Sequence, residues 1–193
     1  MSTYVVLDLE MCKVPKGLKR KFFPASRELI EIGAVALNEN YEIVDTFMTY
    51  VRPEFGWIDR EIQALTGITP AHVQNAPDTR SALEALAAWL PEDAVFVTWS
   101  ENDVCQLDKE LYLKGLDVPG LYDAMDYYID CQEIFSDRMN TSKIYRLSEA
   151  LTIADIYYDP AIHDALVDAR NTAMLFAKVQ TEETLTLSPY LIA

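Results

Sequence analysis

Two carboxylates, Asp8 and Glu10, follow directly on a short apolar run at residues 4–7 of this 193-residue chain. The run is aromatic and β-branched, which favours a buried strand over a helix. Because side chains alternate along a strand, both carboxylates are expected on one face, with Cα atoms roughly 6.6 Å apart. No basic residue lies within the run, and burying an unpaired carboxylate pair is costly. The pair therefore indicates a divalent-cation site, unless it lies on the solvated end of an edge strand.

A third carboxylate, Asp103, follows an apolar strand predicted at residues 94–99. It is expected in the first turn of a helix at residues 101–114, where strand ends and helix starts converge and ligands bind in α/β folds. The helix dipole stabilises an anion at this position, which is also a sufficient structural explanation for it.

A histidine and two further carboxylates open the last predicted helix. Asp164 suits the N-cap, and Asp168 lies one turn further on, beside small residues that would let the helix approach the sheet closely. A carboxylate on a packed face needs a partner, and a cation at Asp8 would provide one. His163, just before the helix, could reach a metal-bound water or could be a surface histidine near a cap.

Composition indicates one globular α/β domain. Half of the residues are hydrophobic, and we predict a domain at residues 1–180 followed by a tail at 181–193. No apolar run is long enough for a membrane span, and no basic-then-apolar leader is present, so we expect no membrane partner. Three widely spaced cysteines suggest free thiols in a reducing cytoplasm. Two histidines are too few for a histidine-built metal site, whereas carboxylate-held hard cations remain open.

The charge of the chain bears on whether it can bind nucleic acid. The net charge of −15 argues against a phosphate backbone as partner. One segment after Glu10 is nevertheless basic and free of acidic residues. It could lie over the acidic pair, or it could be an ordinary solvated loop. Its basic residues are Lys13, Lys16, Lys19, Arg20, Lys21 and Arg27.

Three strands are expected first, and helices then alternate with strands. This order implies a mixed sheet with helices on its faces. The remaining strands are predicted at residues 29–37, 41–51 and 127–131, and the remaining helices at 58–65, 79–90, 131–137, 146–151 and 164–180. Residues 70–77 are expected to form a loop between prolines.

With this set of acidic residues and a histidine, the chain resembles the DEDDh exonucleases, a DnaQ-like family with the ribonuclease H-like fold. Asp8-Leu9-Glu10, Asp103 and the His163 to Asp168 spacing match the family in order. The segments Glu28 to Val35 and Leu65 to Thr69 also look similar to its second strand and its substrate loop. The resemblance covers about residues 3 to 180 and is greatest to the KapD-like and histone-mRNA and small-RNA-trimming branch. It implies a five-stranded sheet of order 3-2-1-4-5 with strand 2 antiparallel.

The resemblance also implies roles for these residues. Asp8, Glu10, Asp103 and Asp168 would hold two ions of Mg²⁺ or Mn²⁺, which activate the attacking water and stabilise the leaving 3′ oxygen. His163 would be the general base, as histidine exchanges protons readily near neutral pH. The product would be nucleoside 5′-monophosphates released from 3′ ends. The expected substrate contacts are Leu9, Met11, Leu65, Thr66, Trp99, Asn102, His163, Lys19, Arg20 and Lys21.

Two departures shape the expected substrate. Met11-Cys12 stands where many relatives carry a threonine, and Met11 could pack softly on a base. The acidic body implies modest, salt-dependent affinity for long nucleic acid, which favours single-stranded RNA or short oligonucleotides. A DNA-directed proofreading-type exonuclease and a regulatory binding module with the same fold are the alternatives. The oligomeric state stays open, with a homodimer among the options.

Overall fold

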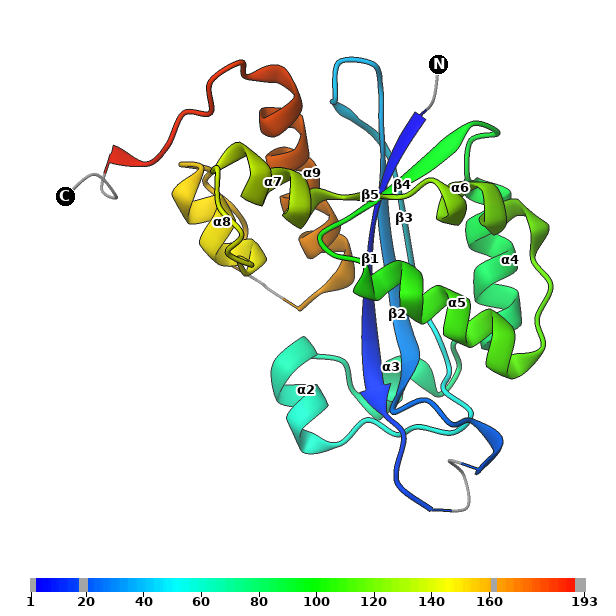
Figure 1. Cartoon of the computed structure of the whole chain (residues 1–193). Coiled ribbons are helices and arrows are strands. Elements are labelled where there is room, and N and C mark those ends of the chain that lie inside the picture. The colour runs from blue at the N-terminus through cyan, green and yellow to red at the C-terminus, as the bar shows by residue number, and fades with distance from the viewer. Residues whose placement is uncertain (1–2, 18–20, 161–162, 190–193) are drawn as a thin grey trace.

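The computed structural model describes residues 3–17, 21–160 and 163–189 of the chain. Within these ranges, strands form one mixed sheet in the order β3-β2-β1-β4-β5 (Figure 1). The central strand β1 (Thr3–Lys13) pairs antiparallel with β2 (Arg27–Leu37) and parallel with β4 (Ala94–Thr98). The edge strands are β3 (Ile43–Tyr50) and β5 (Ile129–Asp130). The predicted ribonuclease H-like sheet and its strand order are confirmed.

Helices cover both faces of the sheet (Figure 1). One face packs against α4 (Thr79–Trp89), α5 (Asn102–Lys114), the 3₁₀ turn η1 (Pro119–Leu121) and α6 (Tyr122–Asp126). The other packs against α7 (Cys131–Arg138) and α9 (Ala165–Thr181), with α8 (Leu147–Ile153) outside them. Near the end of β1 lie α2 (Arg60–Thr66) and α3 (Pro70–Val73).

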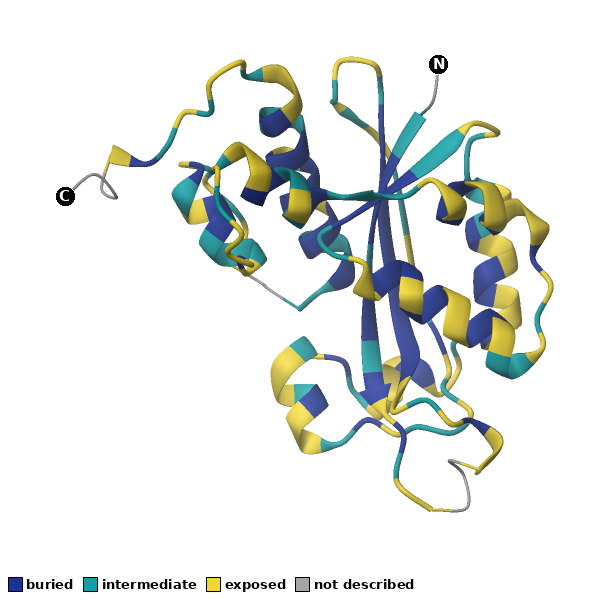
Figure 2. Ribbon diagram, viewed as in Figure 1, coloured by how far each residue is buried: buried dark blue, intermediate teal, exposed yellow. Residues whose placement is uncertain are grey.

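The alternation of side chains along β1 divides its residues between two cores. Val5, Leu7 and Leu9 are buried with residues of α4 and α5, whereas Val6 is buried with residues of α9. Figure 2 shows this burial along the centre of the sheet. Because the period of a strand is two residues, Asp8 and Glu10 follow Val6 on the α9 face.

Capping residues and glycines set the starts and ends of several helices where the sequence indicates. The Asp78 carboxylate accepts a hydrogen bond of 2.9 Å from the Ser81 N–H and so caps α4. Gly67 and Gly115 follow α2 and α5 in the left-handed conformation that glycine adopts without a Cβ penalty. The predicted caps and glycine stops at these positions are confirmed.

The elements differ from the prediction in four places. Residues 119–126, for which no element was predicted, contain η1 and α6. The expected loop at residues 70–77 contains α3, because Pro70 occupies its first turn and Thr69 and His72 form a capping box. The strand expected at residues 127–131 is only Ile129–Asp130, which pairs with Val97 and Thr98 alone. Conversely, β1 continues to Lys13, since β2 remains paired with it beyond a bulge.

The chain continues beyond α9 along the surface of α7 and α8. The Ser188 N–H donates to the Ile153 carbonyl at 2.8 Å, and Arg138 Nη2 donates to the carbonyls of Glu182 and Glu183. The division of the chain into a domain and a tail at residue 180 stays a prediction. Among the described helices, none has the length and apolar character needed to cross a membrane.

The absence of a side chain at Gly33 lets α9 start directly on β2. A Cβ built at Gly33 would lie 2.2 Å from the Ala165 carbonyl carbon and 2.3 Å from the Leu166 nitrogen. These are backbone atoms, so a Gly33→Ala change must displace the start of α9. We expect it to lower the free energy of unfolding by about 2 kcal/mol, measured by urea denaturation.

Gly120→Ala is the matched control. A Cβ there meets the Ala87 methyl at 3.1 Å, a contact that a small shift relieves. We expect a loss below about 1 kcal/mol for this control. Equal stability of Gly33→Ala and the wild type would contradict the close approach of α9 to β2.

Candidate active site

Asp8 and Glu10 lie on the part of β1 that extends past the end of β4. The β1–β4 pairing runs only from Thr3 to Val6 on β1. Beyond Val6, that side of β1 is therefore free for groups from other elements. On its other side, β1 stays paired with β2, and Glu10 lies opposite Glu31.

Asp103 reaches this free side of β1 from the first turn of α5, as the sequence predicts. Its Oδ1 accepts a hydrogen bond of 3.1 Å from the Leu9 N–H. The Asp103 side chain thus takes a strand donor that β4 is too short to satisfy. This bond places the third carboxylate beside the first two.

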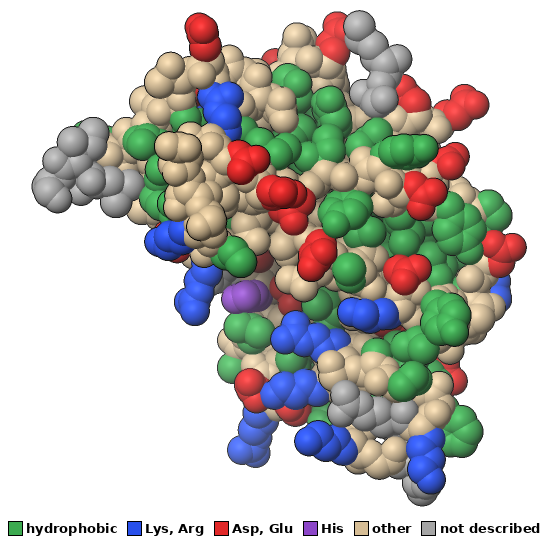
Figure 3. All heavy atoms as spheres, viewed as in Figure 1, with side chains coloured by type: hydrophobic (Ala, Val, Ile, Leu, Met, Phe, Trp, Pro, Cys, Tyr) green, Lys and Arg blue, Asp and Glu red, His purple; other side chains and the backbone are tan. Residues whose placement is uncertain are grey.

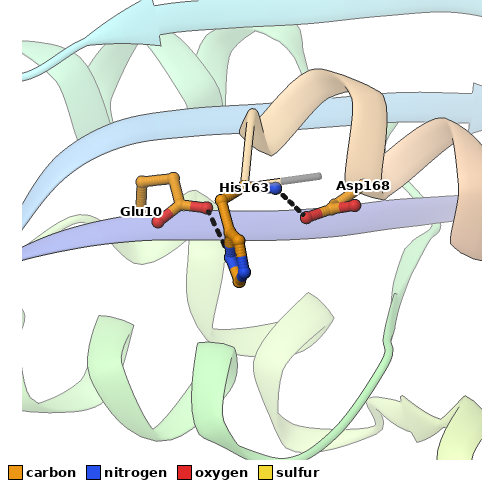
Figure 4. A group of neighbouring side chains, drawn as sticks. All are labelled: Glu10, His163 and Asp168. Atoms are coloured by element: carbon orange, nitrogen blue, oxygen red, sulfur yellow. Dashed lines mark hydrogen bonds and ion pairs between the residues drawn. The ribbon is translucent and has the colours of Figure 1, made fainter. Parts of the chain in front are cut away.

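The start of α9 supplies Asp168 and His163. Asp164 caps the helix by accepting from the Val167 N–H at 3.0 Å. Asp168 Oδ2 accepts from the His163 N–H at 2.8 Å, and His163 Nδ1 lies 3.8 Å from Glu10 Oε1 (Figure 4). Ligand atoms of Glu10, His163 and Asp168 all lie within 4.8 Å of one another. The structure therefore joins residues 8, 10, 103, 163 and 168 in one site.

Burial and mutual repulsion raise the pKa values of the carboxyl groups. Burial, then Asp103 and Asp168, raise the pKa of Asp8 well above its usual range. Burial and then the charges of Asp168 and Glu31 raise the pKa of Glu10 to about 8. Burial raises the pKa of Asp103 to about 7, although the Leu9 N–H opposes the shift. Burial also raises the pKa of Asp168, against the lowering effect of the His163 N–H.

The donor set fits divalent cations. Over the described ranges, no lysine or arginine forms an ion pair with any of the four carboxylates. Asp168 Oδ1 is buried and accepts no hydrogen bond of normal geometry from a described residue, although Asn171 lies near enough to lower its pKa. Hard oxygen ligands without a protein counter-charge are the ligands that Mg²⁺ and Mn²⁺ prefer.

The sequence reasoning missed a fifth carboxylate, Glu31, which is only 1% exposed. Its Oε2 accepts a hydrogen bond of 3.1 Å from the Ala165 N–H, so Glu31 fixes the first residue of α9 to β2. Burial raises its pKa to about 7. Glu31 could have been found from the sequence, because it is an ionisable residue inside a predicted strand that is otherwise apolar.

A cavity of about 810 Å³ opens over the carboxylates. Of the predicted substrate contacts, the cavity lining includes Leu9, Met11, Leu65, Trp99, Asn102 and His163. It also includes residues that the sequence did not indicate, namely Gln132 and the run Ile144, Tyr145, Arg146, Leu147 and Ser148. A second cavity of about 680 Å³ shares Asp8, Met11 and Trp99 with the first.

The remaining predicted contacts are placed differently. The Thr66 hydroxyl donates to the Ile62 carbonyl and accepts from the Ile68 N–H, and it lines neither cavity. Lys19 and Arg20 lie outside the described residues, and Lys21 is exposed away from both cavities. Of the basic segment, Lys13 and Arg27 do line the larger cavity.

Comparisons with known proteins agree with this geometry. The Exonuclease (RNase_T) family model matches residues 5–176. "ERI1 exoribonuclease 2" of Danio rerio is 31% identical over 94% of this chain and 35% of its own length. "Probable 3′-5′ exonuclease KapD" of Bacillus subtilis (strain 168) is 25% identical over 94% of this chain and 86% of its own length.

A solved structure has the same fold. The nuclease domain of 3′hExo, described as a DEDDh family member bound to rAMP, superposes with a TM-score of 0.73 and 24% identity. The match covers 97% of this chain and 96% of that domain. This chain belongs to the exonuclease family, so the predicted membership of an exonuclease family is confirmed. The family uses divalent metal ions, in agreement with the donor set.

The raised pKa values predict an unusual dependence of stability on pH. Glu10 has an ordinary pKa of 4.5 and a pKa of about 8 in the folded protein. The metal-free folded state therefore holds protons that the unfolded state has lost, and its stability falls as pH rises from about 4.5 to about 8. Bound metal replaces those protons, so Mn²⁺ should stabilise the protein more at pH 8 than at pH 5.5. Near saturation we expect a rise in Tm of about 5–10 °C at pH 8.

Differential scanning fluorimetry across this pH range, with and without Mn²⁺, measures both trends. Glu10→Gln should flatten the metal-free slope, and Glu84→Gln, an exposed carboxylate change on α4, should not. Equal stabilisation by Mn²⁺ at both pH values would contradict the competition between protons and metal.

Proposed function

We propose that this protein removes nucleoside 5′-monophosphates from the 3′ ends of single-stranded RNA or short oligonucleotides. The observation that carries the proposal is the convergence of four carboxylates and one histidine, from β1, α5 and the start of α9, on one site beside two cavities that share Asp8. Hydrolysis of a phosphodiester needs an activated water and a stabilised leaving oxygen. Two divalent ions, when bound, supply a more acidic water and positive charge for the leaving group.

Asp8, Glu10, Asp103 and Asp168 would hold Mg²⁺ or Mn²⁺ in this site. Two of these carboxylates are positioned by hydrogen bonds before any metal arrives, because the Leu9 N–H fixes Asp103 and the His163 N–H fixes Asp168. Burial first, and then mutual repulsion, raise the carboxyl pKa values, and ions bound there would remove the repulsion.

His163 would act as the general base. Its side chain is 43% exposed and lines the cavity beside Glu10, so it can accept a proton from an attacking water there. Its backbone adopts a φ of 66°, and the hydrogen bond from its N–H to Asp168 supports this conformation. The same bond therefore ties the base to a metal-binding carboxylate.

The apolar side of the cavity would receive the terminal nucleoside. Leu9, Met11, Ile62 and Leu65 line it beside Glu10, and their side chains can pack on a base and a ribose. The acidic body would limit affinity for long chains, which favours short single strands as substrates.

Two relatives support RNA as the substrate, since one is named an exoribonuclease and another was solved with rAMP, whereas others are named DNA polymerase III PolC-type and support the DNA-directed alternative. Lys13 and Arg27, which line the larger cavity, would add phosphate contacts, with Lys19, Arg20 and Lys21 as further candidates.

A reducing cytoplasm would suit the thiols, which are free at all three cysteines.

Digestion of matched RNA and DNA oligonucleotides in Mn²⁺ tests the proposal. We expect 5′-monophosphates released stepwise from the 3′ end, with RNA degraded faster than DNA. Asp8→Asn should lower kcat by about 10³-fold or more by removing a metal ligand, and His163→Ala by about 10²–10⁴-fold.

Glu84→Gln, on the exposed face of α4, is the control and should keep full activity. Faster digestion of DNA would favour the proofreading-type alternative. No release of mononucleotides by the wild type, with Asp8→Asn indistinguishable from it, would favour a binding module instead.

A further inference from the structure

The larger cavity reaches beyond the carboxylates in two directions. One end is lined by Glu61, Ile62 and Leu65 of α2, and the other by residues 144–148 at the start of α8. Figure 1 shows α2 and α8 on opposite sides of the start of α9, which carries Asp168. The site of hydrolysis therefore lies between two separate walls.

A phosphodiester at that site likewise joins two groups, the terminal nucleoside and the nucleotide before it. If the terminal nucleoside lies at the α2 end, as in the proposed function, the nucleotide before it must leave along the other wall. That wall has no assigned role. Its side chains decide whether it can bind a nucleotide.

Residues 143–146 precede α8 and are held by contacts with α7. Tyr145 is buried against Phe135, and its carbonyl accepts a hydrogen bond of 2.7 Å from Gln132 Nε2. The Ser136 hydroxyl donates to the Lys143 carbonyl at 2.8 Å. The backbone of Arg146 is extended, with φ −74° and ψ 151°. The segment is therefore held from behind by α7.

Two exposed side chains of this segment line the cavity. They are those of Ile144 and Arg146, and the buried Tyr145 also lines it. Ile144 is 77% exposed, although it is a large apolar residue. Single exposed apolar residues are common, but this one adjoins an exposed arginine inside the catalytic cavity.

Two arginines that line the larger cavity, Arg27 and Arg146, form no ion pair with a described carboxylate, whereas Lys13 is paired with Asp59 and Glu61. Of these two arginines, Arg146 is the one that belongs to the wall formed by residues 144–148. Figure 3 shows basic side chains gathered mainly toward the lower end of the molecule, with acidic ones spread over the rest of this face. An unpaired guanidinium beside an exposed apolar side chain matches a phosphate followed by an unpaired base.

We propose that Ile144 and Arg146 bind the penultimate nucleotide of a single strand, with Arg146 on a phosphate and Ile144 against the base. This subsite rests on the proposed function, because it takes the α2 end as the place of the terminal nucleoside. It assigns a role to two exposed side chains whose backbone is held by hydrogen bonds from Gln132 and Ser136.

The test separates binding from hydrolysis. Affinity for a 5′-fluorescein-labelled RNA hexanucleotide is measured by fluorescence anisotropy in Ca²⁺ over a range of salt concentrations. Arg146→Ala should weaken binding about fivefold to tenfold and reduce the salt slope by about 0.7, the value for one phosphate contact on a single strand. Ile144→Ser should weaken binding about fivefold without changing the slope.

A second substrate lacks the penultimate nucleotide. The p-nitrophenyl ester of thymidine 5′-monophosphate carries a nitrophenol in its place. In Mn²⁺, Arg146→Ala should hydrolyse this ester at the wild-type rate, while its KM for the hexanucleotide rises. Arg80→Ala and Val44→Ser, exposed changes remote from the cavity, are the matched controls, and thermal melting verifies that each variant is folded.

Unchanged affinity and salt slope in Arg146→Ala would overturn the subsite, as would the absence of hexanucleotide binding by the wild type. A loss of binding in Lys109→Ala but not in Arg146→Ala would also overturn it, since Lys109 lines only the second cavity and the strand would then leave through that cavity. Binding that depends on Arg146 without release of mononucleotides would support the subsite and overturn the proposed function.

Discussion

The site depends on negative charge that the described protein does not compensate. Four carboxylates from β1, α5 and α9 meet where no described lysine or arginine pairs with them. Elsewhere in this chain, two buried acids are neutralised by a buried lysine. Lys114 Nζ lies 2.7 Å from Glu28 Oε1 and 2.9 Å from Glu110 Oε2, and all three side chains are buried. The contrast within one molecule indicates that the charge at the site is retained for a cation.

The fold brings these acids together through a few specific features. A short β4 leaves the Leu9 N–H free for Asp103, and Gly33 lets the backbone of α9 approach β2. Glu31 then holds the Ala165 N–H, which sets the position of Asp168. None of these features contacts the substrate in the proposed mechanism, yet each one determines where a metal-binding oxygen lies.

Much of this could be predicted from sequence, because the signals were local. An apolar run ending in Asp8 and Glu10 indicates a strand with two acids on one face, and Asp164 is a clear helix cap. The sheet order came from the resemblance to a family, and the acids, spaced along the whole chain, carried that resemblance. Strand periodicity alone does not specify which strands are neighbours.

The features that were missed depend on tertiary contacts. Glu31 lies in a strand whose sequence reads as core, and only its contact with Ala165 reveals its role. The segment around Ile144 and Arg146 has no helical or strand periodicity, so its place in the cavity follows from the packing of Tyr145 on α7. Thr66 shows the converse, since local hydrogen bonds at the end of α2 occupy the hydroxyl that the resemblance assigned to substrate.

The most direct test of the uncompensated charge is calorimetric titration of the metal-free protein with Mn²⁺ at pH 7, in two buffers of different ionisation enthalpy. The raised pKa values of Glu10 and Asp103 mean that these groups carry protons at this pH, which metal must displace. The account predicts saturable binding with net proton release, seen as a difference in apparent enthalpy between the buffers. Absence of binding, or binding with the same enthalpy in both buffers, would contradict it.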